Sequence, residues 1–166
     1  MADAEALFAA HQSGLLRYLS RAVGHGDIAR DLTQDVFVRV VRAEALPGAD
    51  TERRAWLFRI ARNIAIDHQR KQHVRGPETL LAPEPSRTAS QDTTLEVSEA
   101  LGQLDPIDRD VFLMREVAGL SYAEISTACD LTADAVRSRI HRARLQLREH
   151  LSRQIAARRQ APLCAK

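Results

Sequence analysis

Apolar residues recur in the first part of the chain at intervals of three and four, the spacing that places them on one face of an α-helix. Glycine and proline interrupt this pattern twice, at Gly24-His25-Gly26 and at Leu46-Pro47-Gly48. The pattern therefore predicts three helices, over residues 4–23, 27–43 and 52–72. Asp27 is the candidate N-cap of the second helix, because its carboxylate can accept hydrogen bonds from free backbone amides. Three such helices could bury one compact core.

A stretch without helical periodicity follows and divides the chain. Residues 76–94 contain three prolines, one glycine and many serines and threonines, a composition typical of an extended linker. The helical spacing returns at Leu95, and Asp105-Pro106 predicts the start of a further helix. No segment alternates apolar and polar residues as a strand would. The predicted fold is all-α, with two small helical domains (1–75 and 95–157), a flexible linker (76–94) and a tail (158–166).

The second domain contains the most specific local pattern in the chain, a helix-turn-helix. Ser121 and Glu124 have the spacing of a capping box, which predicts the start of a short helix ending at Cys129. A three-residue turn and a long helix from Ala133 complete the motif. In such a motif the second helix is free to enter the DNA major groove.

The long helix from Ala133 separates apolar from polar side chains. Its apolar positions are expected to point toward the core: Val136, Ile140, Ala143 and Leu147. The opposite face offers side chains that can bond to base edges: Arg137, Ser138, His141 and Arg142. The flanks carry arginines suited to phosphate contacts: Arg139, Arg144 and Arg148. A basic helix can also simply complement its own dipole, but the capping box and the turn favour DNA reading.

The net charge is only +2, but the basic residues are concentrated in two blocks. Residues 53–75 hold seven basic residues against one acid, and residues 137–159 hold eight against one. Residues 96–136, which lie between the blocks, hold nine acids and two arginines. This distribution predicts two separate contacts with a polyanion, although solvated helix faces would give a similar pattern.

Aromatic residues are interleaved with basic ones in the first block, around Trp56 and Phe58. Opened nucleic-acid strands bind surfaces of this kind, because bases stack on aromatic rings while cations follow the backbone. Both aromatic side chains could instead pack in the core of the first domain. The pattern alone leaves these two interpretations open.

The remaining composition argues against several classes of protein. No apolar run approaches the roughly 20 residues that span a bilayer, and the N-terminus lacks the features of a signal peptide, so a cytoplasmic location is expected. Cys129 and Cys164 lack metal-ligand spacing and are expected to be unpaired thiols, with Cys129 buried. The histidines form no metal-binding pattern and no glycine-rich phosphate loop is present, so neither an enzyme nor a cofactor is expected.

Three motifs occur in a characteristic order along the chain. They are Asp27-Ile-Ala-Arg-Asp-Leu-Thr-Gln-Asp-Val-Phe-Val-Arg-Val, Ala55-Trp-Leu-Phe-Arg-Ile-Ala-Arg-Asn-Ile-Ala-Ile-Asp, and Val136-Arg-Ser-Arg-Ile-His-Arg-Ala-Arg at the end of the helix-turn-helix. Together they resemble regions 2 and 4 of extracytoplasmic-function (ECF) sigma factors, the sigma-70 group that lacks regions 1 and 3, and the resemblance covers residues 5–151. The chain departs from the family where Asp134-Ala135 replaces a usual Gly-Thr and where His141 replaces a common aromatic residue.

The resemblance implies a transcription initiation factor that gives core RNA polymerase its promoter specificity. Polymerase docking would fall to polar residues of the second helix: Asp31, Gln34, Asp35 and Arg39. Melting and contact of the −10 element would fall to the third helix: Trp56, Arg59 and Asn63. The −35 element would be read by the base-facing residues of the last helix: Arg137, Ser138, His141 and Arg142. An anti-sigma factor would be expected to cover the docking surfaces of both domains.

A stand-alone helix-turn-helix regulator is the alternative interpretation. Such a protein would need a dimerisation or ligand domain, whereas residues 1–75 show no heptad seam and no ligand signature. It would also bind duplex DNA without polymerase, which a gel shift with the purified chain would reveal.

Overall fold

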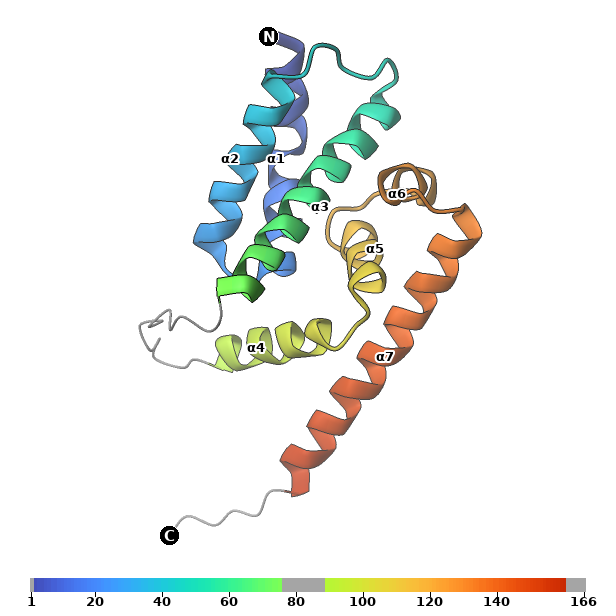
Figure 1. Ribbon diagram of the computed structural model, residues 1–166. Helices are drawn as coiled ribbons and strands as arrows, with labels where there is room; N and C mark the ends of the chain where they lie inside the picture. The colour runs from blue at the N-terminus through green and yellow to red at the C-terminus, as the bar shows by residue number, and fades with distance from the viewer. Residues whose placement is uncertain (1, 76–88, 161–166) are drawn as a thin grey trace.

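The computed structural model describes residues 2–75 and 89–160 (Figure 1). These residues form α-helices and no strand, which confirms the all-α prediction. The helices are α1 (Ala2–Val23), α2 (Gly26–Val41), α3 (Asp50–Arg75), α4 (Ala89–Gly102), α5 (Pro106–Glu116), α6 (Tyr122–Cys129) and α7 (Ala133–Gln160). In Figure 1, α1, α2 and α3 form one group, and α3 is on the side of that group that faces α5 and α6.

The bounds of α1, α2 and α3 lie within three residues of the predicted ones, but the N-cap of α2 and the start of α4 differ from the prediction. Asp27 was the predicted N-cap of α2, but His25 occupies that position with an extended backbone, and Asp27 lies in the first turn. There the Asp27 carboxylate forms a 2.7 Å ion pair with Arg30 instead of capping the helix. Helix α4 begins at Ala89, inside the predicted linker, because no proline or glycine lies between Pro85 and that helix. Residues 76–88 of the predicted linker lie outside the described residues.

The predicted start signals in the second half of the chain are confirmed. Asp105 is the N-cap of α5, and its Oδ1 accepts a hydrogen bond of 3.1 Å from the Ile107 amide. Gly119 follows α5 with a φ of 71°, a backbone conformation that favours glycine. Ser121 and Glu124 form both hydrogen bonds of the capping box at the start of α6.

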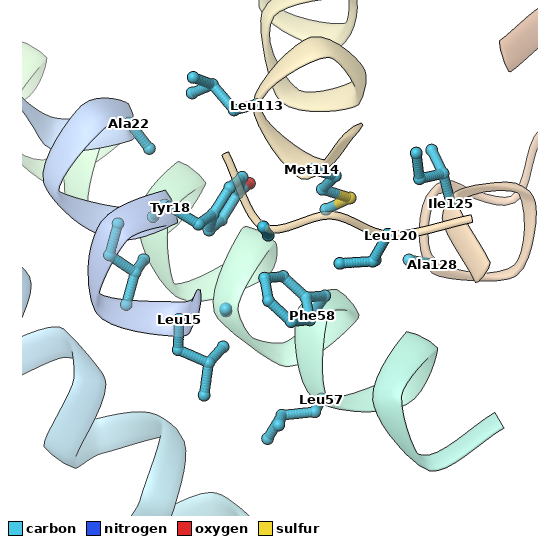
Figure 2. Packing of buried hydrophobic residues seen from close by; sticks show 14 of the residues in the cluster. Leu15, Tyr18, Ala22, Leu57, Phe58, Leu113, Met114, Leu120, Ile125 and Ala128 are labelled. Atoms are coloured by element: carbon cyan, nitrogen blue, oxygen red, sulfur yellow. The ribbon is translucent and has the colours of Figure 1, made fainter. Parts of the chain in front are cut away.

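The buried apolar residues form one continuous core that includes residues from both halves of the chain. Tyr18 of α1 and Phe58 of α3 are almost completely inaccessible to solvent, and their rings meet edge to face with centroids 5.7 Å apart. Phe58 is therefore a core residue, whereas Trp56 is only partly buried. Figure 2 shows Phe58 extending from α3 toward Met114 and Leu120, which belong to the second half of the chain.

Candidate nucleic-acid interfaces

The helix-turn-helix consists of α6, a tight turn and α7. Asp130 makes the turn possible by adopting a left-handed conformation with φ of 56°, which aspartate tolerates better than most residues. The Ser126 hydroxyl donates to the Leu131 carbonyl, and the Ala135 amide donates to the Thr132 hydroxyl at 3.2 Å. These bonds fix the angle between α6 and α7, so that the orientation of α7 depends on short-range contacts.

Helix α7 turns its apolar residues inward as predicted. Val136, Ile140 and Ala143 are buried, and Leu147 packs against the core from its edge. The predicted base-reading residues are all exposed: Arg137, Ser138, His141 and Arg142. An exposed polar face on a capped helix-turn-helix is accessible to the edges of bases in a major groove.

Two of the predicted DNA-contacting arginines also hold the second half of the chain together. Asp108 of α5 is completely buried, and its carboxylate accepts from Arg139 at 2.6 Å and from Arg142 at 3.2 Å. The predicted phosphate-contacting residue Arg144 likewise pairs with Glu116 of α5, while Arg148 is exposed. Sequence reasoning missed Asp108, because nothing in the local pattern distinguishes it from the exposed acids nearby.

The predicted −10 residues lie in different environments along α3. Asn63 is exposed and Trp56 is partly buried. Arg59 donates through Nη2 to the backbone carbonyl of Thr127 on α6. Its neighbours Arg54 and Arg62 also contact the second half of the chain, and sequence reasoning missed this role, although both belong to the first basic block.

Burial changes the ionisation of the groups between the two halves. Burial raises the pKa of the Asp110 carboxyl above its ordinary value, although the Arg62 guanidinium partly offsets this effect. The pKa of His11 is lowered, first by burial and then by the charge of Arg54. Burial also raises the pKa of the Cys129 thiol to about 11. Cys129 is only partly buried, not fully as predicted, and it lies 3.7 Å from the Met114 sulfur.

The predicted polymerase-docking residues are exposed along α2: Asp31, Gln34, Asp35 and Arg39. Beside them a groove runs between α1 and α2, lined by Phe8, Leu16 and Phe37 among others. The Phe8 and Phe37 rings lie 4.7 Å apart at this groove. An apolar groove bordered by polar side chains suits a protein partner.

Residues 2–75 and 89–160 contain neither a candidate metal site nor a candidate membrane span. Over these ranges, histidine, cysteine, aspartate and glutamate nowhere gather in a group of three or more that could hold a metal ion. None of the helices described for the chain is both long enough and apolar enough to span a membrane.

Comparison with known proteins gives matches over both halves of the chain. The family model described as Sigma-70 region 2 matches residues 7–75, and the one described as Sigma-70, region 4 matches residues 94–147. The probable RNA polymerase sigma-C factor of Mycobacterium bovis is 32% identical over 148 residues, which cover 84% of this chain and 78% of that protein. The RNA polymerase sigma factor CarQ of Myxococcus xanthus is 34% identical over 153 residues, 89% of this chain and 88% of that protein.

Two solved structures have a similar fold. CnrH, solved in complex with the cytosolic domain of CnrY, superposes with a TM-score of 0.64 at 28% identity and covers 90% of this chain and 87% of its own. The sigma factor RpoE of Bartonella quintana, solved with the anti-sigma factor NepR, superposes with a TM-score of 0.64 at 24% identity, over 91% of this chain and 95% of its own.

Proposed function

The chain belongs to the ECF group of sigma-70 RNA polymerase sigma factors, and we propose that its two halves read two promoter elements through the residues described above. Sigma factors direct core polymerase to promoters. Helices α1–α3, here called region 2, would dock on polymerase and contact the −10 element. Helices α4–α7, here called region 4, would read the −35 element.

The exposed face of α7 is the observation that carries the assignment of region 4. Ser138 and His141 are exposed there and can reach base edges, and Arg137 is free to exchange its exposed partner Asp134 for DNA. Arg142 would read DNA while remaining close to Asp108. Arg139, Arg144 and Arg148 would contact phosphates, which position a protein without specifying sequence.

Region 2 would act by differential binding, without covalent chemistry. Asn63 and Arg59 would contact the non-template strand and Trp56 would lie near the fork of the duplex, so that opened −10 sequences are captured in preference to others. Asp31, Gln34, Asp35 and Arg39 would face polymerase beside the groove between α1 and α2. Such a protein is not an enzyme, and it would work where polymerase works, in the cytoplasm.

An anti-sigma factor is the proposed regulator. The fold of this chain is similar to that of RpoE, which is bound by the anti-sigma factor NepR, and to that of CnrH, which is bound by the cytosolic domain of CnrY. The apolar groove between α1 and α2 would be one of the surfaces that such a partner covers.

Run-off transcription with purified core polymerase over a library of promoter sequences would test the proposal. The full chain should select a subset of −35 and −10 sequences. His141→Ala and Ser138→Ala should change the preferred −35 sequence only, and Asn63→Ala the −10 sequence only. Arg153→Ala is the control, because Arg153 is an exposed arginine of α7 beyond the proposed DNA face. Unchanged start-site selection in the presence of the chain would contradict the proposal.

A further inference from the structure

A cleft lies at the end of the region 2 helices that faces α4 (Figure 1). The last turn of α1, the start of α2 and the C-terminal part of α3 line one side of it, and α4 and the start of α5 line the other. Its volume is about 550 Å³, within the range of about 300–1,000 Å³ that is typical of small-molecule sites. None of the residues proposed above for promoter reading or polymerase docking lines this cleft.

The ionisable side chains of the cleft are all basic. Among the described residues that line it, none is an aspartate or a glutamate, and five are basic: Arg21, His25, His68, His73 and Arg109. Another cleft of the same structure, near His11, mixes acidic and basic side chains. A cleft lined by one sign of charge concentrates ions of the opposite sign. We call the first one the basic cleft.

The two arginines of the basic cleft have no carboxylate partner within residues 2–75 and 89–160, whereas Arg62 and Arg139 each pair with a buried aspartate. Arg21 is exposed, and Arg109 donates through Nη2 to Gln69 Oε1 at 3.2 Å. In this part of the chain Arg109 Nε is buried and has no hydrogen-bond partner. Both guanidinium groups therefore keep donors that an anion could use, and phosphate oxygens match their geometry.

Backbone amides at the start of α2 add further donors. His25 is the N-cap of this helix, and its side chain makes no capping hydrogen bond. The first amide that bonds back along the helix is that of Ala29, to the His25 carbonyl, so the preceding amides of the first turn have no helical partner. His25 and Ile28 line the basic cleft, which places this end of α2 at the cleft. Free amides at the start of a helix favour an anion.

Gln69 of α3 joins the two sides of the basic cleft. Its Nε2 donates to the Ala22 carbonyl of α1 at 3.0 Å, and its Oε1 accepts from Arg109 of α5. These bonds fix Arg109 relative to the ends of α1 and α3. A site that is ordered before its ligand arrives loses less conformational entropy on binding.

The basic cleft also has an apolar part. Leu101 is buried there, and Val23 and Ile28 are partly buried. An inorganic anion would leave these side chains uncovered, whereas an organic group attached to the anion would cover them. Small-molecule sites commonly combine an apolar lining with a few polar groups that fix the orientation of the ligand.

From these observations we propose that the basic cleft binds a small molecule that carries a diphosphate group, of the class of the nucleoside diphosphates. The two phosphate groups would contact Arg21, Arg109 and the amides at the start of α2, and the organic part would lie against Ile28 and Leu101. This site is separate from the residues proposed to contact DNA and polymerase, so the inference goes beyond the proposed function and does not rest on it.

Isothermal titration calorimetry of the full chain tests the proposal, with ADP as the probe. A salt concentration near 0.15 M screens the exposed charges of the chain. ADP should bind with a dissociation constant below about 1 mM. Pyrophosphate should bind more weakly, because it covers no apolar surface, and adenosine should not bind. Absence of ADP binding, or adenosine binding as tight as that of ADP, would overturn the proposal.

Arg21→Gln is the variant that tests the site, because Arg21 is exposed and has no ion pair in the described ranges, so its loss leaves the packing intact. It should weaken ADP binding about tenfold, the effect of losing one charged hydrogen bond. Arg17→Gln is the matched control, since it makes the same change one turn earlier in α1, at an exposed arginine that does not line the cleft. Equal weakening in both variants would show that net charge holds ADP, and would overturn the proposal.

Two further measurements confirm where ADP binds. ADP should raise the Tm of the wild-type chain and of Arg17→Gln more than that of Arg21→Gln, because a ligand stabilises the folded state in proportion to how tightly it binds there. A labelled single-stranded oligonucleotide should not compete with ADP. Competition, together with equal weakening of oligonucleotide and ADP binding in Arg21→Gln, would assign the cleft to the DNA backbone and overturn the proposal. Run-off transcription is a separate measurement, so a failure of ADP binding leaves the proposed function standing.

Discussion

Asp108 supports a quantitative prediction about what holds region 4 together. Its carboxylate is completely buried and accepts hydrogen bonds from Arg139 at 2.6 Å and from Arg142 at 3.2 Å. Asp108→Asn removes the negative charge and turns an NH₂ group, which can only donate, toward one of two guanidinium groups that also only donate. The substitution should therefore destabilise the packing of α5 against α7.

The size of the effect follows from the burial of the three groups. Removing one partner of a buried ion pair costs about 3–5 kcal/mol. Here the Arg142 side chain is 56% exposed and Arg139 is 29% exposed, so both can regain water when the carboxylate is lost. We therefore expect a loss of about 2 kcal/mol in unfolding free energy. For a chain of this length that corresponds to a fall in Tm of about 4–8 °C.

Thermal unfolding followed by circular dichroism would measure this change. Asp134→Asn is the control, because it neutralises an aspartate whose side chain is 90% exposed and which pairs with Arg137 at 2.8 Å. The control should shift the unfolding free energy by less than about 0.5 kcal/mol. If the two variants lowered Tm by the same amount, burial would not be the source of the stabilisation by Asp108.

Three further predictions concern individual positions. Arg142→Ala should lose about 1–3 kcal/mol of discrimination between −35 sequences and should also lower the free energy of unfolding. Arg137→Ala should weaken promoter binding without changing the free energy of unfolding. Competition binding measures the first effect and thermal unfolding the second. Gly119→Ala should lower the free energy of unfolding, measured by denaturant titration, by about 1–2 kcal/mol. The cause is the φ of 71° at this position and not a lack of space, because the new Cβ would meet nothing closer than Arg54 at 3.9 Å. At pH 8 the Cys129 thiol, with its pKa of about 11 against an ordinary 9.0, should react with iodoacetamide roughly a hundred times more slowly than in the urea-unfolded chain, as followed by mass spectrometry.

Local signals in the sequence predicted the helices and the helix-turn-helix well. The capping box at Ser121 and the N-cap at Asp105 were found because each depends on residues two or three positions apart. The inward face of α7 followed from its apolar spacing. The N-cap of α2 was predicted wrongly, because a good capping residue at Asp27 lies two positions after the residue that occupies the cap.

Contacts between distant residues could not be predicted in this way. Arg62 and Asp110 are 48 positions apart, and Arg54 and Glu124 are 70 apart. Neither a period nor a capping pattern relates such residues, so the sequence showed basic blocks without showing what they bind. The same limit applied to Asp108, whose burial depends on how α5 and α7 pack.

The internal pairing of the arginines bears on which residues can give promoter specificity. Arg59 and Arg139 each have an oxygen partner in the chain, so DNA binding exchanges one hydrogen bond for another and the net gain is small. Ser138, His141 and Asn63 are exposed and have no ion pair or side-chain hydrogen bond with the described part of the chain, so they lose only water on binding. We therefore expect promoter choice to depend on these three polar residues and on the more exposed Arg142, whereas Arg59 and Arg139 contribute affinity that falls as salt is raised. A specificity profile that changed more in Arg139→Ala than in His141→Ala would contradict this division.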